Sequence, residues 1–179
     1  MPTGRRDFLK FSASALASYF TLPATRKTFA ASVYPLDSDR VAFPQGVASA
    51  DPQPDAVLLW TRVEPLPNEQ RTPVVLQVSL TNRFEELLLE QTLVTTTESD
   101  FTTRAMVHEL EPDTTYYYRF IAPDGAASRV GRTWTAPLPD AKRPVMIALA
   151  SCQNWPPNRY GAYRRLIQDD QMADKDSGI

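Results

Sequence analysis

Short runs of strand-forming residues, separated by turn signals, follow one another over residues 43–135. The clearest run is 74–80, in which every second residue is aliphatic and Gln77 and Ser79 lie between them. A period of two places the aliphatic side chains on one face of a strand and the polar ones on the other. The pattern therefore predicts a half-buried strand, with Leu80 on the same face as the other aliphatic residues.

Other segments of this region have the same character. Strands are predicted at residues 56–61, 102–110, 116–121 and 130–135. The segment Glu86 to Thr97 is less regular; its first part allows a short helical turn, and its second part favours a strand. About seven short strands with frequent turns indicate a mostly β fold, an antiparallel β-sandwich.

One corner of this sandwich has a more specific pattern. Between Leu110 and Tyr118, Leu, Pro, Thr, Tyr and Tyr occupy every second position, as in the E–F corner of fibronectin type III domains. In that corner a buried tyrosine bonds its hydroxyl to the preceding loop. We assign this structural role to Tyr116; an ordinary aromatic strand is the alternative.

A different pattern begins after a proline-rich linker at residues 137–144. Residues 145–150 are all apolar, which is typical of a strand buried on both faces in an α/β layer. Cys152 follows this strand directly, at the position where α/β folds place their sites. Residues 158–168 have helical spacing of Tyr and aliphatic side chains, and the sequence from 172 to 179 is a polar tail.

The first 31 residues read as an export leader. An apolar run of about 12 residues, 11–22, is too short to span a bilayer, which takes about 20. It suits the centre of a signal peptide, and small residues near Ala30 predict cleavage after that position. The preceding residues resemble a twin-arginine signal through Arg5, Arg6, Phe8, Leu9 and Lys10. Basic residues by chance at the start of the chain are the alternative.

Composition limits the partners. The net charge is −2, and it becomes −6 when the first 30 residues are left out. With no basic block outside the leader, we expect no nucleic-acid partner. The single cysteine excludes an internal disulfide, and the single histidine, His108, falls in a predicted sandwich strand. Sixteen prolines and six glycines fit strands joined by stiff turns.

Three segments together resemble the alkaline phosphatase D (PhoD-like) family. They are the opening signature at 43–62, which reads F-P-Q-G-V-A-S-A-D-P followed by L-W-T-R, the 110–118 corner, and 147–153 with the helix behind it. Ala50 stands where the family usually has glycine, at a turn that can require a positive φ. The resemblance implies a fibronectin-like domain at 40–136 and the first strand and helix of a metallophosphatase α/β domain at 145–171.

The resemblance also implies function. The family hydrolyses phosphomonoesters and phosphodiesters outside the cytoplasm with iron and calcium, and a cysteine thiolate is one of the iron ligands. Only Cys152 matches that ligand, and without the family it would read as a buried structural thiol. We therefore expect a phosphate-ester substrate, the twin-arginine translocase as a partner, a periplasmic or secreted location, and no permanent membrane span.

The other metal ligands of the family have no counterpart in these 179 residues. We expect an incomplete catalytic domain, no catalytic residues, no bound metal, and no phosphatase activity from this chain by itself, because several converging ligands are needed. Two alternatives remain open. One is a relative of the purple acid phosphatases, and the other is a free-standing extracytoplasmic β-sandwich that serves as a binding module.

Overall fold

The computed structural model describes residues 29–30, 40–142, 147–151 and 160–176. The chain separates into two units, Met1–Pro139 and Asp140–Ile179, and each is described by itself. The elements, in chain order, are β1 (Phe29–Ala30), β2 (Val47–Ala50), β3 (Val57–Arg62), β4 (Arg71–Ser79), β5 (Glu86–Leu87), β6 (Leu89–Thr96), the 3₁₀ turn η1 (Thr97–Ser99), β7 (Thr102–Val107), β8 (Thr115–Ile121), β9 (Gly131–Trp134) and α3 (Gly161–Asp176).

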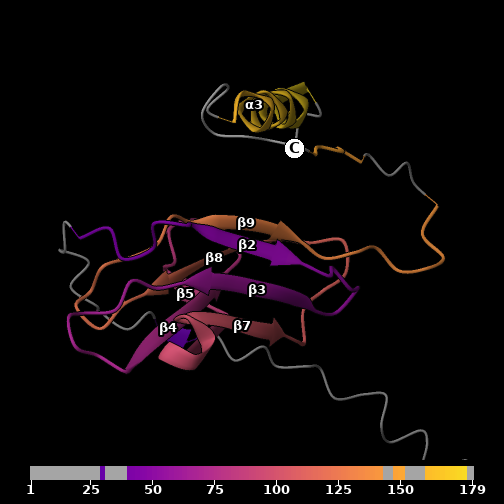
Figure 1. The fold of residues 1–179 in the computed structure, drawn as a ribbon. Helices are drawn as coiled ribbons and strands as arrows, with labels where there is room; N and C mark the ends of the chain where they lie inside the picture. The colour runs from indigo at the N-terminus through magenta and orange to yellow at the C-terminus, as the bar shows by residue number, and fades with distance from the viewer. Residues whose placement is uncertain (1–28, 31–39, 143–146, 152–159, 177–179) are drawn as a thin grey trace, which may run out of the picture. The chain divides into compact units, whose positions relative to one another are not determined.

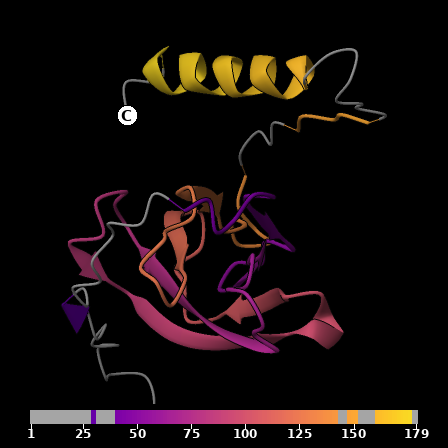
Figure 2. The ribbon, with the colours of Figure 1, turned by 60° about the vertical axis from the view of Figure 1, so that its left-hand side comes forward.

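Within the described residues of the first unit, two antiparallel sheets form a sandwich (Figures 1 and 2). One sheet has the order β2-β3-β7 and the other the order β6-β4-β8-β9. The chain changes sheet between β3 and β4, between β6 and β7, and between β7 and β8. Such crossing connections are typical of immunoglobulin-like sandwiches. The mostly β antiparallel fold that the sequence predicts is confirmed.

The core lies between the two sheets. In β3 the residues alternate between buried and half-buried, so that Val57 and Leu59 point inward. The opposite sheet contributes the three buried rings of β8, and two of them, Tyr118 and Phe120, meet edge to face at 6.2 Å. The largest buried side chains thus come from alternate positions of strands in both sheets, which is what holds the sheets together.

The outer face of β4 differs from the prediction. Gln77 and Ser79 are fully buried, and Leu80 lies past the end of β4 with 43% of its surface exposed. The reason is the connection after β4, which packs Phe84 and Leu87 into a second buried group on the outer side of the sheet. A period-two pattern cannot show that a loop will cover the polar face of a strand.

The segment 86–97 contains no helical turn at its start. Glu86 and Leu87 form β5, and the whole of β6 pairs with β4, from Leu89 opposite Val78 to Thr96 opposite Arg71. The helical turn allowed by the sequence is therefore wrong. The nine-residue β4 offers a ladder of backbone groups along this segment, and that ladder determines its conformation.

Pro73 lies inside β4, a central strand, without disrupting it. β4 pairs with β6 from Arg71 to Val78, but with β8 only from Val75 to Ser79. At Pro73 the strand has one neighbour, so the missing N–H costs no ladder bond on the second side.

The second unit contains α3, and its preceding apolar segment is not a strand in the described residues. Residues 147–151 have no strand assignment, and Ile147 and Leu149 are 83% and 92% exposed. α3 begins at Gly161 and continues to Asp176, so the helix starts later than predicted and extends into the segment predicted to be a polar tail. A strand buried on both faces requires neighbouring strands, and the described part of this unit contains none.

Candidate functional site

Six of the residues singled out in the sequence lie outside the described part of the chain. They are Cys152 and the five leader residues Arg5, Arg6, Phe8, Leu9 and Lys10. His108 is described; it is exposed and follows the end of β7 instead of lying in the strand. Among the described residues no three His, Cys, Asp or Glu side chains converge to hold a metal ion. The described residues therefore do not fit a metal centre by themselves.

Tyr116, at the start of β8, is fully buried. Its hydroxyl oxygen accepts a hydrogen bond of 2.8 Å from the backbone N–H of Glu111, in the loop before the strand. This is the geometry of a tyrosine corner, in which the side chain fixes the turn between two strands that lie in opposite sheets. The contact is structural and contributes no chemistry.

Thr135 completes this corner, and the sequence analysis did not single it out. Its buried hydroxyl donates to the carbonyl of Glu111 at 2.6 Å and accepts from the backbone N–H of Thr114 at 3.0 Å. Threonine is common in strands, so this residue carries no signal by itself. Its position two residues before the predicted linker is the one clue that it holds the end of β9 in place.

The loop after β2 holds the same end of the chain from the other sheet. The backbone carbonyl of Gln53 accepts a hydrogen bond from the Ala136 N–H at 3.1 Å. The Ala136 carbonyl in turn accepts one from the Asp113 N–H at 3.2 Å. The Asp55 carbonyl accepts from Leu110 at 3.0 Å. The opening signature and the tyrosine corner, which are far apart in sequence, thus meet where the chain leaves the sandwich.

The turn of the opening signature has its strained position one residue later than expected. Ala50 is the last residue of β2 and pairs with Leu58, whereas Asp51 has a positive φ of 48°. Because the left-handed conformation falls on Asp51, which tolerates it better than most residues, alanine at position 50 causes no backbone strain. Gly46, with φ of 73°, occupies the other left-handed position of the signature.

The second buried group, on the outer side of the β6-β4-β8-β9 sheet, includes the charged side chain of Arg119. The guanidinium of Arg119 donates to the Gln77 side-chain oxygen at 2.8 Å, and the Gln77 amide donates to Glu90 at 2.7 Å. The same guanidinium lies 4.3 Å from the centre of the Phe84 ring. Burial lowers the pKa of Arg119, and the nearby Glu90 carboxylate opposes that shift. These groups satisfy one another and read as a structural network.

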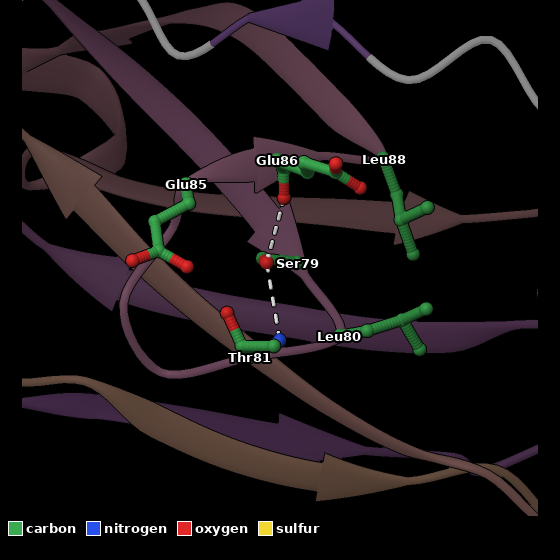
Figure 3. Close-up of a pocket in the computed structure, with 6 residues that line it drawn as sticks. All are labelled: Ser79, Leu80, Thr81, Glu85, Glu86 and Leu88. Carbon is green, nitrogen blue, oxygen red and sulfur yellow. Dashed lines mark hydrogen bonds between the residues drawn. The ribbon is translucent and has the colours of Figure 1, made fainter.

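A shallow pocket of about 240 Å³ lies beside this group (Figure 3). It is lined by Ser79, Leu80, Thr81, Glu85, Glu86 and Leu88. The Ser79 hydroxyl donates to the Glu86 carbonyl at 2.7 Å and accepts from the Thr81 N–H at 3.1 Å. Figure 3 shows the hydroxyl held between these two backbone groups, with the side chains of Glu85 and Glu86 nearby. Because the hydroxyl donates its proton to a backbone carbonyl, the arrangement closes a turn.

Two further ionisable groups are shifted by the fold. Burial raises the pKa of the Tyr118 hydroxyl to about 12, and a hydrogen bond with Ser49 acts in the opposite direction. The pKa of Asp124 is lowered, chiefly because the Arg40 guanidinium donates to its carboxylate at 2.6 Å. Arg40 also donates to the Glu64 carbonyl at 2.7 Å, so this ion pair ties three loops of the sandwich together.

No helix in the described ranges is long and apolar enough to cross a membrane. Most of the polar contacts described above position the backbone at the edges and ends of the sandwich.

Comparison with known proteins identifies a family for the sandwich domain. Residues 28–137 match the family model described as PhoD-like phosphatase, N-terminal domain. The chain is 35% identical over 134 residues to alkaline phosphatase D of Bacillus subtilis (strain 168), which is 71% of this chain and 23% of that protein.

The chain is also similar to parts of solved structures. A structure of PhoD superposes with a TM-score of 0.55 at 33% identity, over 60% of this chain and 22% of that one. The fn3 domain of human contactin 1 has a TM-score of 0.38 at 15% identity, over 65% of this chain and 92% of that domain. The chain thus spans less than a quarter of the length of its two phosphatase relatives.

Proposed function

The chain belongs to the PhoD-like phosphatase family through its N-terminal domain, and from this premise we propose that it is the N-terminal portion of an exported, metal-dependent alkaline phosphatase and phosphodiesterase. The observation that carries the proposal is the match of residues 28–137 to the N-terminal domain of that family. The substrate class is phosphate esters, as the name of the Bacillus relative implies.

Cys152 is the residue of this chain that we assign to the metal. A thiolate is a good ligand for iron and is deprotonated when it binds. Ser151, the last described residue before it, ends the segment that follows the sandwich and its linker. When bound, iron and calcium would supply Lewis-acid activation of the phosphate ester. No step of that chemistry is assigned to the described residues.

The role of the sandwich in this proposal is positional. Hydrogen bonds from Thr135 and Ala136 to two separate loops determine where the chain leaves it. The linker therefore starts from a defined point on the sandwich. This favours a positioning function, not a catalytic one, for residues 40–136. We propose a leader at 1–31, the sandwich at 40–136, a linker at 137–144 and the start of the catalytic domain from residue 145, with α3 running through the boundary predicted between 145–171 and 172–179.

Export is the second part of the proposal. The pair Arg5 and Arg6, followed by Phe8, Leu9 and Lys10, supports use of the twin-arginine translocase and a periplasmic or secreted location. A folded sandwich that forms before export agrees with that route. Fusion of residues 1–39 to a reporter, with and without Arg5→Lys and Arg6→Lys, tests it; export of the double variant at the unchanged level would contradict it.

Activity is tested on the purified chain with p-nitrophenyl phosphate and bis-p-nitrophenyl phosphate, with iron and calcium added and metal content measured. We expect no turnover, because 179 residues with one cysteine and one histidine lack the converging ligands that a metal hydrolase uses. Turnover that disappears in Cys152→Ala would overturn this expectation. Turnover that persists in Cys152→Ala would overturn the assignment of Cys152 as well.

A binding module is the second candidate, because residues 40–136 bury a core of their own. The two candidates differ in the segment that follows the sandwich. A purified chain that folds as a monomer with its residues after Pro137 disordered favours the binding module, whereas ordered residues after Pro137 favour the phosphatase proposal.

A further inference from the structure

β6 (Leu89–Thr96) is an edge strand with one open side. It pairs with β4 on its other side, and among the described residues no strand pairs with the open one. β1 pairs with β5, which ends before β6 begins. The outward backbone N–H and C=O groups of an edge strand are a template for pairing with another chain. In the described part of the chain, β6 is the longest edge strand of the two sandwich sheets.

The other edge strands of the sandwich carry features that oppose such pairing. β2 and β9 have only four residues each, β2 stops at the left-handed Asp51, and β9 contains Arg132. β7 presents the exposed Arg104. Short length, charge and bends are the usual protection of sheet edges. β6 has none of these between Gln91 and Thr96, where every residue is uncharged and none is proline or glycine.

Both faces of β6 leave apolar surface for a neighbouring strand to cover. Leu93, opposite Val74, lies on the inner face and is only partly buried against the core. Val94, opposite Pro73, lies on the outer face and is 53% exposed. A strand added beside β6 would cover more of both side chains and would leave the pairing of β6 with β4 in place.

We propose that β6 is the interface of a homodimer, in which the β6 strands of two copies pair antiparallel about a two-fold axis at Leu93. An axis perpendicular to the sheet relates two antiparallel strands and uses the same surface of each copy, so a second chain matches β6 in length and twist. In this register Thr92 lies opposite Val94 of the partner subunit. The two sheets of order β6-β4-β8-β9 then join into one continuous sheet.

Charge favours both the second copy and the register. The chain has a net negative charge, so two copies approach most easily where neither carries charge, as β6 does not after Glu90. An axis one residue later would place Glu90 level with Glu98 of the partner subunit, and like charges directly opposite destabilise a strand pair. With the axis at Leu93, Glu90 lies opposite Thr96 of the partner subunit and keeps its hydrogen bond of 2.7 Å from the Gln77 amide.

The dimer is tested on the purified full chain by sedimentation velocity over a range of concentrations, with two matched variants. Thr92→Lys/Val94→Lys places two pairs of lysines directly opposite each other and should raise the dissociation constant of the dimer by about tenfold or more. Thr92→Glu/Val94→Lys places opposite charges at the same positions and should restore dimerisation. Both positions are exposed, so neither variant disturbs the core; thermal denaturation checks that both fold.

A full chain that is monomeric at every concentration would overturn the proposal. So would a dimer with the same dissociation constant in both variants, which is the result expected if the exposed Ile147 and Leu149 cause the association. Amide hydrogen exchange locates the interface independently. Exchange within 91–95 should slow as the concentration of the wild-type chain rises, and should not change with concentration in Thr92→Lys/Val94→Lys. Slowing confined to other segments would contradict the assignment of β6.

Discussion

The sandwich and the segment after it make opposite use of the same residue types. Leu59 in β3 is fully buried, and Leu149, in a run that is more uniformly apolar, is 92% exposed. The difference does not lie in hydropathy, because the second segment is the more hydrophobic of the two. It lies in the availability of partners: β3 has a strand on each side and a facing sheet, and the described residues 147–151 have no strand beside them. An apolar run specifies that a strand will be buried only when the layers that bury it are present.

The largest effect is expected from truncating these two leucines. Leu59→Ala should lower the free energy of unfolding by about 2–5 kcal/mol, because it leaves a cavity between the sheets. Leu149→Ala should change it by less than about 0.5 kcal/mol, since the side chain makes little contact. Urea denaturation followed by tryptophan fluorescence measures both. Similar losses for the two variants would show that residues 147–151 are packed after all.

Alkaline pH should affect the sandwich through one buried hydroxyl. Because burial raises the pKa of Tyr118 to about 12 in the folded state, the unfolded chain loses this proton first, near pH 10. The protonated Tyr118 hydroxyl thus contributes about 2–3 kcal/mol to the free energy of unfolding. This contribution is intact below pH 10 and is lost as the pH rises towards 12. The free energy of unfolding of Tyr118→Phe should fall less steeply over this range. Parallel curves for the two proteins would contradict a protected hydroxyl.

A pair of glycines sharpens the comparison at the level of backbone. A Cβ at Gly131 in β9 would lie 2.3 Å from the Tyr118 ring, which covers this glycine from the neighbouring strand, whereas a Cβ at Gly161 in α3 meets nothing within 4 Å. Gly131→Ala should therefore cost about 1–3 kcal/mol of unfolding free energy. Gly161→Ala should leave it unchanged and raise helix content slightly. Thermal denaturation by circular dichroism measures both, and an unperturbed Gly131→Ala would mean that the ring can move aside.

The smallest effect concerns the corner. Tyr116→Phe removes the hydroxyl that accepts from the Glu111 N–H and should cost about 1–2 kcal/mol, because the ring still fills the core while the donor loses its partner. Tyr163→Phe in α3, whose ring is 42% exposed, is the control with the same chemical change. Chemical denaturation of the two variants checks this, and equal midpoints would indicate that Glu111 is satisfied by water.

Much of the sandwich could be predicted from the sequence, because its core-facing residues recur with a period of two and its turns are marked by proline and glycine. The corner could also be predicted, since the pattern around Tyr116 spans one loop and one strand. The covered outer face could not: the burial of Gln77 depends on a loop containing Phe84, and no local pattern connects the two. Likewise, Thr135 bonds to backbone groups of Glu111 and Thr114, which only folding brings close to it.

The candidate site was predicted less completely. Cys152 follows from a resemblance and lies outside the described residues, so its role stays a prediction. The strand expected at 145–150 is absent from its described part because strand formation is decided by neighbours. Helix α3, in contrast, continues beyond its predicted end at Gln168, and an Arg165–Asp169 pair at 2.9 Å supports the helix across that position.

The hydrogen bonds that hold the end of β9 have a mechanical consequence. Tension applied to the linker from Pro137 onwards would first reach Ala136 and Thr135, which are bonded to Gln53 on one loop and to Thr114 on another. The load is thus divided between both sheets before it reaches the β8–β9 ladder, which begins at Trp134 opposite Thr115. The end of β9 is therefore bonded to both sheets, so pulling on the linker should extend the linker before it detaches β9.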